Sequence, residues 1–110
     1  MKEISNTRQL AEIVGKNKAV LVYFFNDDCA PCKALRPKIA KMAGEDFPLM
    51  ELYFCNALLH PEIASECMIF SSPTLLVFFD GKESIRESKY ISIPALAGSI
   101  RRYYEMVFGG

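Results

Sequence analysis

Two cysteines three residues apart, Cys29 and Cys32, are the residues of this sequence best suited to covalent chemistry. They follow an apolar run and open a segment with helical periodicity, so we expect them at the N-terminus of a helix. The partial positive charge and free amide groups of a helix N-terminus stabilise a thiolate, which lowers the pKa of Cys29. Cys32 then lies about one turn away, within reach of a disulfide that closes and reopens. The spacing therefore predicts thiol–disulfide exchange, with Cys29 as the nucleophile and Cys32 as the resolving thiol.

The residues around this pair modify the expectation. Pro31 lies in the first turn, where its missing amide leaves no group unpaired, and it stiffens the loop. Asp28, with Asp27 beside it, adds negative charge that raises the pKa of the neighbouring thiol and opposes the effect of the helix terminus. Asp28 is thus a candidate modulator of the cysteine pKa. Two other roles are open for Asp28: an exposed base for Cys32, or a cap of the helix, of which capping is favoured.

The two remaining cysteines, Cys55 and Cys67, form no motif. We expect Cys55 to be a small buried core residue, and Cys67 to be a packing residue rather than a second redox site. A structural zinc site needs four ligands, commonly in two close pairs, and His60 is the only histidine. We therefore expect no metal. Thiol–disulfide exchange needs no organic cofactor either, because the redox group is the Cys29–Cys32 disulfide itself.

The elements that must position the cysteines alternate between strands and helices. The expected strands, rich in β-branched and aromatic residues, cover residues 1–4, 18–25, 49–55, 74–79 and 82–91. Four helices are expected. The first begins at Ser5 or Asn6 and ends near residues 15–17, and the second runs from residue 29 to about 43, where Gly44 ends it. The third covers residues 60–67, and the fourth begins at Pro94. Pro37 is expected to kink the second helix. This order predicts the α/β class, with a central mixed sheet of about five strands and helices on both faces.

Length, composition and charge narrow the function classes. With 110 residues, 51% of them hydrophobic, a single domain over residues 1–110 has enough apolar surface for its own core. Thirteen basic residues balance thirteen acidic ones, which argues against a nucleic-acid or membrane partner bound mainly by charge. The longest apolar run, residues 19–25, is far shorter than the roughly 20 residues that span a bilayer. Because the N-terminal segment lacks the features of a signal peptide, we expect a cytoplasmic protein. We also expect a monomer.

In its motifs the chain resembles the thioredoxin family. The resemblance rests on a strand followed by C-x-P-C-K at residues 29–33, a proline four residues later, a Pro-Thr before a buried strand, and an Asp-Gly hairpin turn at residues 80–81. It implies a thioredoxin-like fold and a protein-disulfide reductase that acts on protein disulfides and is recharged by a partner such as a thioredoxin reductase. It also implies that a cis peptide bond precedes Pro73, which faces the cysteines, and that the backbone of Ser72 pairs with the substrate peptide. Ala30 and Pro31 would belong to the same substrate-binding site.

The sequence departs from the family pattern at the residues expected around the cysteines. Tyr23 replaces the buried acid usually found in the strand before the motif, and the lysine of the next strand falls at about Phe54. Because that acid is usually assigned to accept the proton of Cys32, we expect a slow resolving step. A glycine usual near the last strand is missing from residues 89–91, which predicts a narrower, more aromatic groove and a restricted set of clients. The alternative function is a redox-inert partner-binding module, but two thiols retained at this spacing favour the enzyme.

Overall fold

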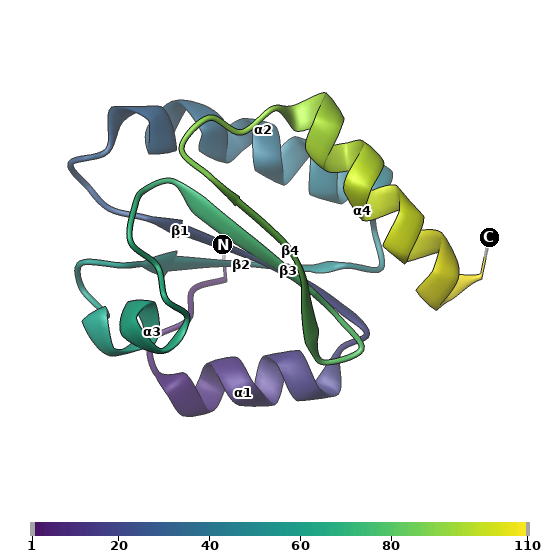
Figure 1. The fold of residues 1–110 in the computed structure, drawn as a ribbon, viewed down its shortest axis with the longest axis horizontal. Helices are drawn as coiled ribbons and strands as arrows, with labels where there is room; N and C mark the ends of the chain where they lie inside the picture. Colours follow the sequence, from purple (N-terminus) through teal and green to yellow (C-terminus); the bar gives the residue numbers. More distant parts are fainter. Residues whose placement is uncertain (1, 110) are drawn as a thin grey trace.

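A four-stranded mixed sheet forms the centre of the structure, a computed structural model that describes residues 2–109. Its strands are β1 (Ala19–Phe25), β2 (Glu51–Asn56), β3 (Thr74–Phe79) and β4 (Lys82–Ser88). Their order across the sheet is β2-β1-β3-β4, with β1 parallel to β2 and antiparallel to β3, and β3 antiparallel to β4. All of β1 is buried, because strands flank it on both sides and helices lie over both faces of the sheet (Figure 1).

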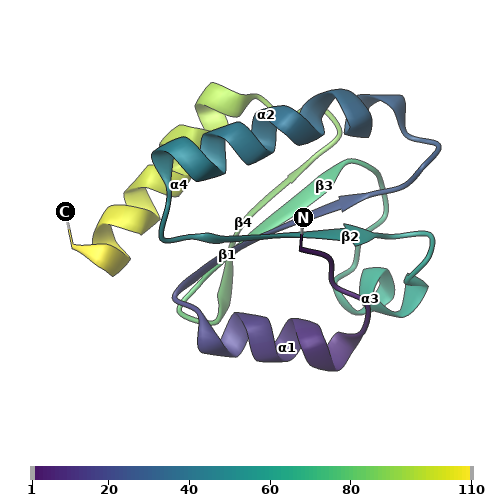
Figure 2. The same cartoon turned by 180° about the vertical axis from the view of Figure 1, so that it is seen from behind.

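Two helices cover each face of the sheet, as the views from opposite sides show (Figures 1 and 2). The helices α1 (Thr7–Lys16) and α3 (Pro61–Glu66) lie over one face, and α2 (Ala30–Asp46) and α4 (Ile93–Phe108) lie over the other. Side chains of β1 alternate between the two cores, with Tyr23 on the side of α2 and α4 and its neighbours Val22 and Phe24 on the opposite side. The predicted α/β class is confirmed.

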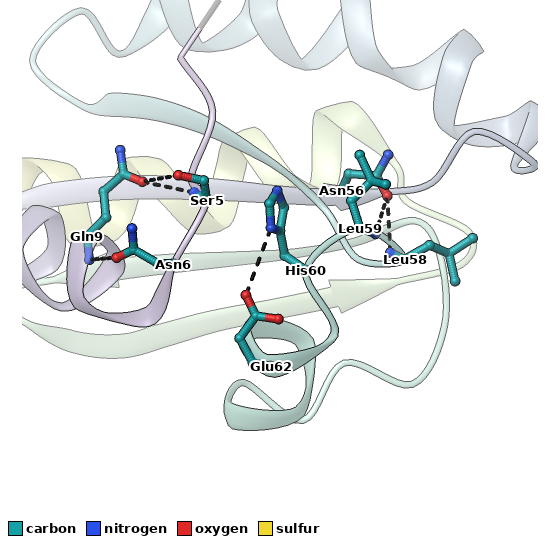
Figure 3. A network of polar contacts seen from close by, with 8 residues as sticks. All are labelled: Ser5, Asn6, Gln9, Asn56, Leu58, Leu59, His60 and Glu62. Atoms are coloured by element: carbon teal, nitrogen blue, oxygen red, sulfur yellow. Dashed lines mark hydrogen bonds and ion pairs between the residues drawn. The ribbon is translucent and has the colours of Figure 1, made fainter.

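Several boundaries follow from local chemistry that the sequence already indicated. Asn6, one of the two predicted caps, begins α1, and its Oδ1 accepts a hydrogen bond from the amide of Gln9 at 2.8 Å (Figure 3). Helix α4 begins at Ile93, one residue before the predicted Pro94, and Ser92 caps it. Asp80 and Gly81 have φ of 51° and 80°, so they form the tight turn between β3 and β4 that the Asp-Gly pair predicts.

The expected strand at residues 1–4 is reduced to a single bridge. Glu3 pairs with Phe54 in parallel, through bonds from the amide of Ile4 to the carbonyl of Phe54 and from the amide of Phe54 to the carbonyl of Lys2. Met1 lies outside the described residues. One paired residue is too short for a strand, so the sheet has four strands in the described chain rather than about five.

Gly44 does not end the second helix as predicted, because α2 continues to Asp46. The amide of Phe47 donates to the carbonyl of Ala43 at 3.1 Å and closes the last turn. Pro48 follows Phe47 and disfavours helical backbone at the residue before it. The stop signal is therefore the proline, and the glycine is tolerated within the helix.

The last strand ends at Ser88, three residues before the predicted end, and α3 is one residue shorter at each end than predicted. Lys89 has φ of 65°, in the left-handed region, which breaks the extended backbone after Ser88. The amide of Lys89 instead donates to the carbonyl of Pro73 at 2.8 Å. This bond ties the segment after β4 to the loop before β3.

Candidate active site

The cysteine pair lies at the N-terminus of α2, as predicted. Cys29 is the N-cap residue, with extended backbone at φ −99°, and Pro31 lies in the first turn of the helix. Cys29 and Cys32 form a disulfide with their Cα atoms 5.3 Å apart. The amide of Cys32 donates to the Sγ of Cys29 at 3.2 Å, so the sulfur of Cys29 receives one of the free amide groups of the helix terminus. Cys29 is 9% exposed and Cys32 is 2% exposed, which makes Cys29 the more accessible of the two.

The prediction that Asp28 caps the helix is wrong. Cys29 takes the capping position, because the helix begins at residue 30, and Asp28 lies exposed in the turn before it. The amide of Asp28 donates to Oδ1 of Asn26 at 2.9 Å. Asp28 thus stays a predicted modulator of the cysteine pKa or a predicted base.

Asn26 is a site residue that sequence reasoning missed. Its Nδ2 donates to Oγ of Ser72 at 3.2 Å, while its Oδ1 holds the turn before Cys29 through the amide of Asp28. The side chain therefore joins the cysteine loop to the loop that carries Pro73. An asparagine directly after a strand and two residues before an aspartate is a typical turn signal, which was the available clue.

A second asparagine supports the cysteine loop from β2. Nδ2 of Asn56 donates to Oδ2 of Asp27 at 3.4 Å. Oδ1 of Asn56 accepts bonds from the amides of Leu58 and Leu59, both at 3.1 Å (Figure 3). Asn56 is buried, so these bonds satisfy a side chain that would otherwise be costly to bury. The hydrogen bond between Asn56 and Asp27 therefore joins the end of β2 to the loop after β1.

The peptide bond between Ser72 and Pro73 is cis, as the family resemblance implied. Pro31 and Pro73 line a groove with a volume of about 440 Å³. Its other lining residues come from α2 and from the segment after β4; they are Ala34, Leu35, Lys38, Lys89, Tyr90, Ile91 and Ser92. Residues 89–91 therefore do face the groove, where Tyr90 presents an almost fully exposed ring. Ala30 is exposed beside the groove, and neither Ala30 nor Ser72 is among its lining residues.

Two of the positions at which the chain departs from the family pattern, Tyr23 and Phe54, are in contact close to Cys32. Tyr23 and Phe54 are paired in register across β1 and β2, and their rings make an edge contact with centroids 5.9 Å apart. The hydroxyl of Tyr23 donates to the backbone carbonyl of Cys32 at 3.0 Å. Burial raises the pKa of Tyr23 to about 12, so the phenol is protonated at neutral pH.

Arg36 is the second residue that sequence reasoning missed. It lies four residues after Cys32 on α2, and its guanidinium carbon is 4.3 Å from the ring centre of Phe25 and 4.4 Å from that of Phe54. The spacing of four residues on a helix was the available clue, because it places Arg36 one turn beyond Cys32 on the same face.

Cys55 and Cys67 lie on the other side of the sheet, in the core under α1 and α3. Burial raises the pKa of Cys55 to about 12, which agrees with the predicted core residue. Cys67 is half-buried, and burial, with Glu66 as a smaller cause, raises its pKa as well. Both free thiols are therefore poor nucleophiles at neutral pH.

Other features of the described residues bear on metals and membranes. Within residues 2–109, no three His, Cys, Asp or Glu side chains gather closely enough to hold a metal ion. His60 precedes α3 without a side-chain cap bond, and its Nδ1 is 3.9 Å from Oε1 of Glu62 (Figure 3). None of the helices described is both long and apolar enough for a bilayer span.

Known proteins resemble this chain in sequence and in fold. The thioredoxin family model matches residues 2–101 of the chain. The chain is 29% identical to the thioredoxin-like protein YdfQ of Bacillus subtilis over 99% of both chains, and 37% identical to the thioredoxin of Mycoplasma genitalium over 76% of this chain and 81% of that one. The X-ray structure of Fasciola hepatica thioredoxin superposes with a TM-score of 0.84 at 27% identity, covering 94% of this chain and 99% of that one. With its cysteine pair joined as a disulfide at the start of α2, the chain belongs to the thioredoxin family, and its chemistry is that of a thiol–disulfide oxidoreductase.

Proposed function

We propose that this protein reduces the disulfides of other proteins by dithiol–disulfide exchange. The observation that carries the proposal is the Cys29–Cys32 disulfide at a helix N-terminus, beside a groove lined by Pro31 and Pro73. A reversible disulfide can store two electrons, and a groove beside it can hold an extended client segment against the sulfur that reacts.

Cys29 is the proposed nucleophile and Cys32 the proposed resolving thiol. In the reduced protein the Cys29 thiolate attacks one sulfur of a client disulfide, forms a mixed disulfide, and expels the other client sulfur as a thiolate. Cys32 then attacks the Sγ of Cys29, closes the internal disulfide and releases the second client thiolate. Two electrons pass from the protein to the client, and both client thiolates take a proton from water.

The proposed client-binding residues are Ala30, Pro31, Ser72 and Pro73, with Ser72 offering main-chain groups to an extended client. Support comes from Pro31 and Pro73, which line the same groove, and from the bond between Asn26 and Ser72 that joins the two loops. Tyr90, whose ring is exposed, Lys38 and Lys89 also line the groove, so they restrict the range of client segments that bind there.

The proposed cycle needs a partner that returns electrons to the Cys29–Cys32 disulfide, and a thioredoxin reductase is the proposed partner. We also propose a monomer that works in the cytoplasm, where clients are reduced rather than oxidised. The alternative, a redox-inert binding module, draws its support from Tyr23 in the place of an acid and Phe54 in the place of a lysine. The disulfide itself favours the enzyme, because partner binding alone has no use for two thiols at bonding distance.

The test is reduction of a protein disulfide, with dithiothreitol as the electron donor, by the wild type and by single cysteine variants. Cys29→Ser is expected to abolish turnover, and Cys32→Ser is expected to accumulate a mixed disulfide with the client that is visible on a non-reducing gel. Cys67→Ser is the matched control and should retain wild-type turnover, because this half-buried thiol lies on the other face of the sheet. Equal rates in all four proteins would favour the binding module.

A further inference from the structure

The interior beside Cys32 contains no group that accepts a proton at neutral pH. Across residues 2–109 no carboxylate is buried, and apart from tyrosine and cysteine the buried polar side chains are Asn56 and Thr74. The hydroxyl that donates to the Cys32 carbonyl belongs to Tyr23. Its pKa is about 12, so this phenol is itself protonated at neutral pH. The proton of the Cys32 thiol therefore has to leave the interior, to water or to an exposed group such as Asp28, and another feature has to favour the thiolate that stays behind.

Arg36 brings a positive charge to this interior. Its guanidinium lies over Phe25 and Phe54, two buried rings of β1 and β2, at 4.3 and 4.4 Å from their centres. The ring of Phe54 also contacts Tyr23, and the charge of Arg36 lowers the pKa of Tyr23, although burial is the larger influence on that group. The charge thus reaches the phenol whose hydroxyl is bonded to Cys32.

The helix places Arg36 on the same face of α2 as the resolving cysteine. Residues four apart on an α-helix have Cβ atoms about 5–6 Å apart on one face, and Arg36 stands in that relation to Cys32. Cys32 is 2% exposed and Arg36 is half-buried, so water screens the field of the guanidinium at the sulfur less than it would between two exposed groups. Stacking on two rings holds the guanidinium in one place and limits the loss of field through side-chain motion.

We propose that Arg36 is a positioning residue for the resolving step, and that its guanidinium, held on Phe25 and Phe54, stabilises the thiolate of Cys32 in place of a base. The proposal rests on the proposed function, since it concerns the second half of the exchange. The Cys32 thiol first gives its proton to water. The thiolate then attacks the Sγ of Cys29, the bond between Cys29 and the client sulfur breaks, and the client leaves as a thiolate that takes a proton from water.

Other charged groups also lie around the cysteines and Arg36. Lys2 and Glu51 share the hollow beside Arg36 and form an ion pair with each other. Charged side chains exposed on the cysteine loop and the first turn of α2 complete the set; they are Asp27, Asp28 and Lys33. These side chains are solvated, so their fields at Cys32 are screened more strongly than that of Arg36.

The experiment follows a single turnover of the fully reduced protein with an aromatic disulfide whose thiolate product absorbs visible light. Attack by Cys29 releases one aromatic thiolate, and attack by Cys32 releases the second. The phase that is missing from Cys32→Ser identifies the resolving step. Rates of both phases are measured against pH in the wild type, Arg36→Met, Arg36→Lys and Arg101→Met. Arg101→Met is the matched control. Arg101 lies in α4, and its guanidinium carbon is 5.2 Å from the ring centre of the core residue Phe47.

In Arg36→Met the pH midpoint of the second phase is expected to rise by about one unit, and below that midpoint the phase slows about tenfold. The first phase should stay within about twofold of wild type in the same variant. Arg36→Lys keeps the charge and is expected to recover most of the rate, and Arg101→Met is expected to match the wild type.

An unchanged pH midpoint in a folded Arg36→Met protein overturns the proposal. Equal slowing in Arg36→Met and Arg36→Lys also overturns it, because the loss would then come from packing and not from charge. If Arg36→Met does not fold, Arg36→Gln takes its place with the same expected midpoint. Absence of the first phase in the wild type would refute the proposed function itself, so the two failures are distinguishable.

Discussion

Replacement of Tyr23 by Phe removes one hydroxyl from beneath the disulfide and leaves the ring in place. The side chain is fully buried, and its hydroxyl donates to the carbonyl of Cys32 at 3.0 Å. A buried hydrogen bond of this kind contributes about 1 kcal/mol. At pH 7 we therefore expect the free energy of unfolding of oxidised Tyr23→Phe to be lower than that of the wild type by about 1 kcal/mol.

At alkaline pH the same substitution is expected to stabilise the protein. Burial raises the pKa of Tyr23 from 10 to about 12 in the folded protein. Between these values the unfolded chain loses the phenol proton while the folded protein keeps it, so the wild type loses stability as the pH rises. The full effect is on the order of 2.7 kcal/mol and exceeds the contribution of the hydrogen bond. The variant should therefore be the more stable protein above about pH 11.

The assay is urea denaturation of both oxidised proteins between neutral pH and about pH 12. Other buried groups, such as Cys55, titrate alike in both proteins and cancel from the difference. Tyr103→Phe is the control for removing a phenol hydroxyl elsewhere. Tyr103 lies in α4, is half-buried, and stacks on Phe79 of β3. A stability difference between wild type and Tyr23→Phe that is the same at every pH would refute the reasoning.

Two further predictions concern residues outside the disulfide. Lys89→Gly should raise the free energy of unfolding by about 1 kcal/mol in thermal denaturation, because φ of 65° strains a lysine and suits a glycine; a lower melting temperature would contradict this. Arg86→Ala should lower the free energy of unfolding by about 1–2 kcal/mol in thermal denaturation, because the guanidinium donates to the carbonyls of Cys67 at 2.8 Å and Met68 at 3.1 Å. A melting temperature equal to that of the wild type would exclude that role.

The central elements of the fold could be predicted because their signals are local. An unbroken apolar run gave β1, and an Asp-Gly pair gave the turn between β3 and β4. Two of the boundaries that differed were decided by backbone states with no local signal, whereas the end of α2 follows a local signal, Pro48, that the prediction passed over in favour of Gly44. Lys89 adopts a left-handed conformation that a lysine rarely takes, and the turn before the helix made Cys29 the cap instead of Asp28.

In the candidate site, too, features that depend on neighbouring residues could be predicted, and contacts between distant residues could not. The spacing of Cys29 and Cys32 predicts both the helix terminus and the disulfide, since both depend on residues close in sequence. The bond between Asn26 and Ser72 spans 46 positions, and the stacking of Arg36 on two rings depends on how α2 lies over β1 and β2. Contacts of this kind arise from tertiary packing, which periodicity alone does not encode.

The most direct test of the account is the acidity and accessibility of Cys29 in the reduced protein. Alkylation is followed against pH by mass spectrometry of the separate cysteine peptides. Because the helix N-terminus offers its charge and the amide of Cys32 to the sulfur, Cys29 should react with an apparent pKa below the roughly 8.5 of a free cysteine, and faster than Cys67. A Cys29 that reacts no faster than Cys67, with a pKa at or above that of a free cysteine, would contradict the account.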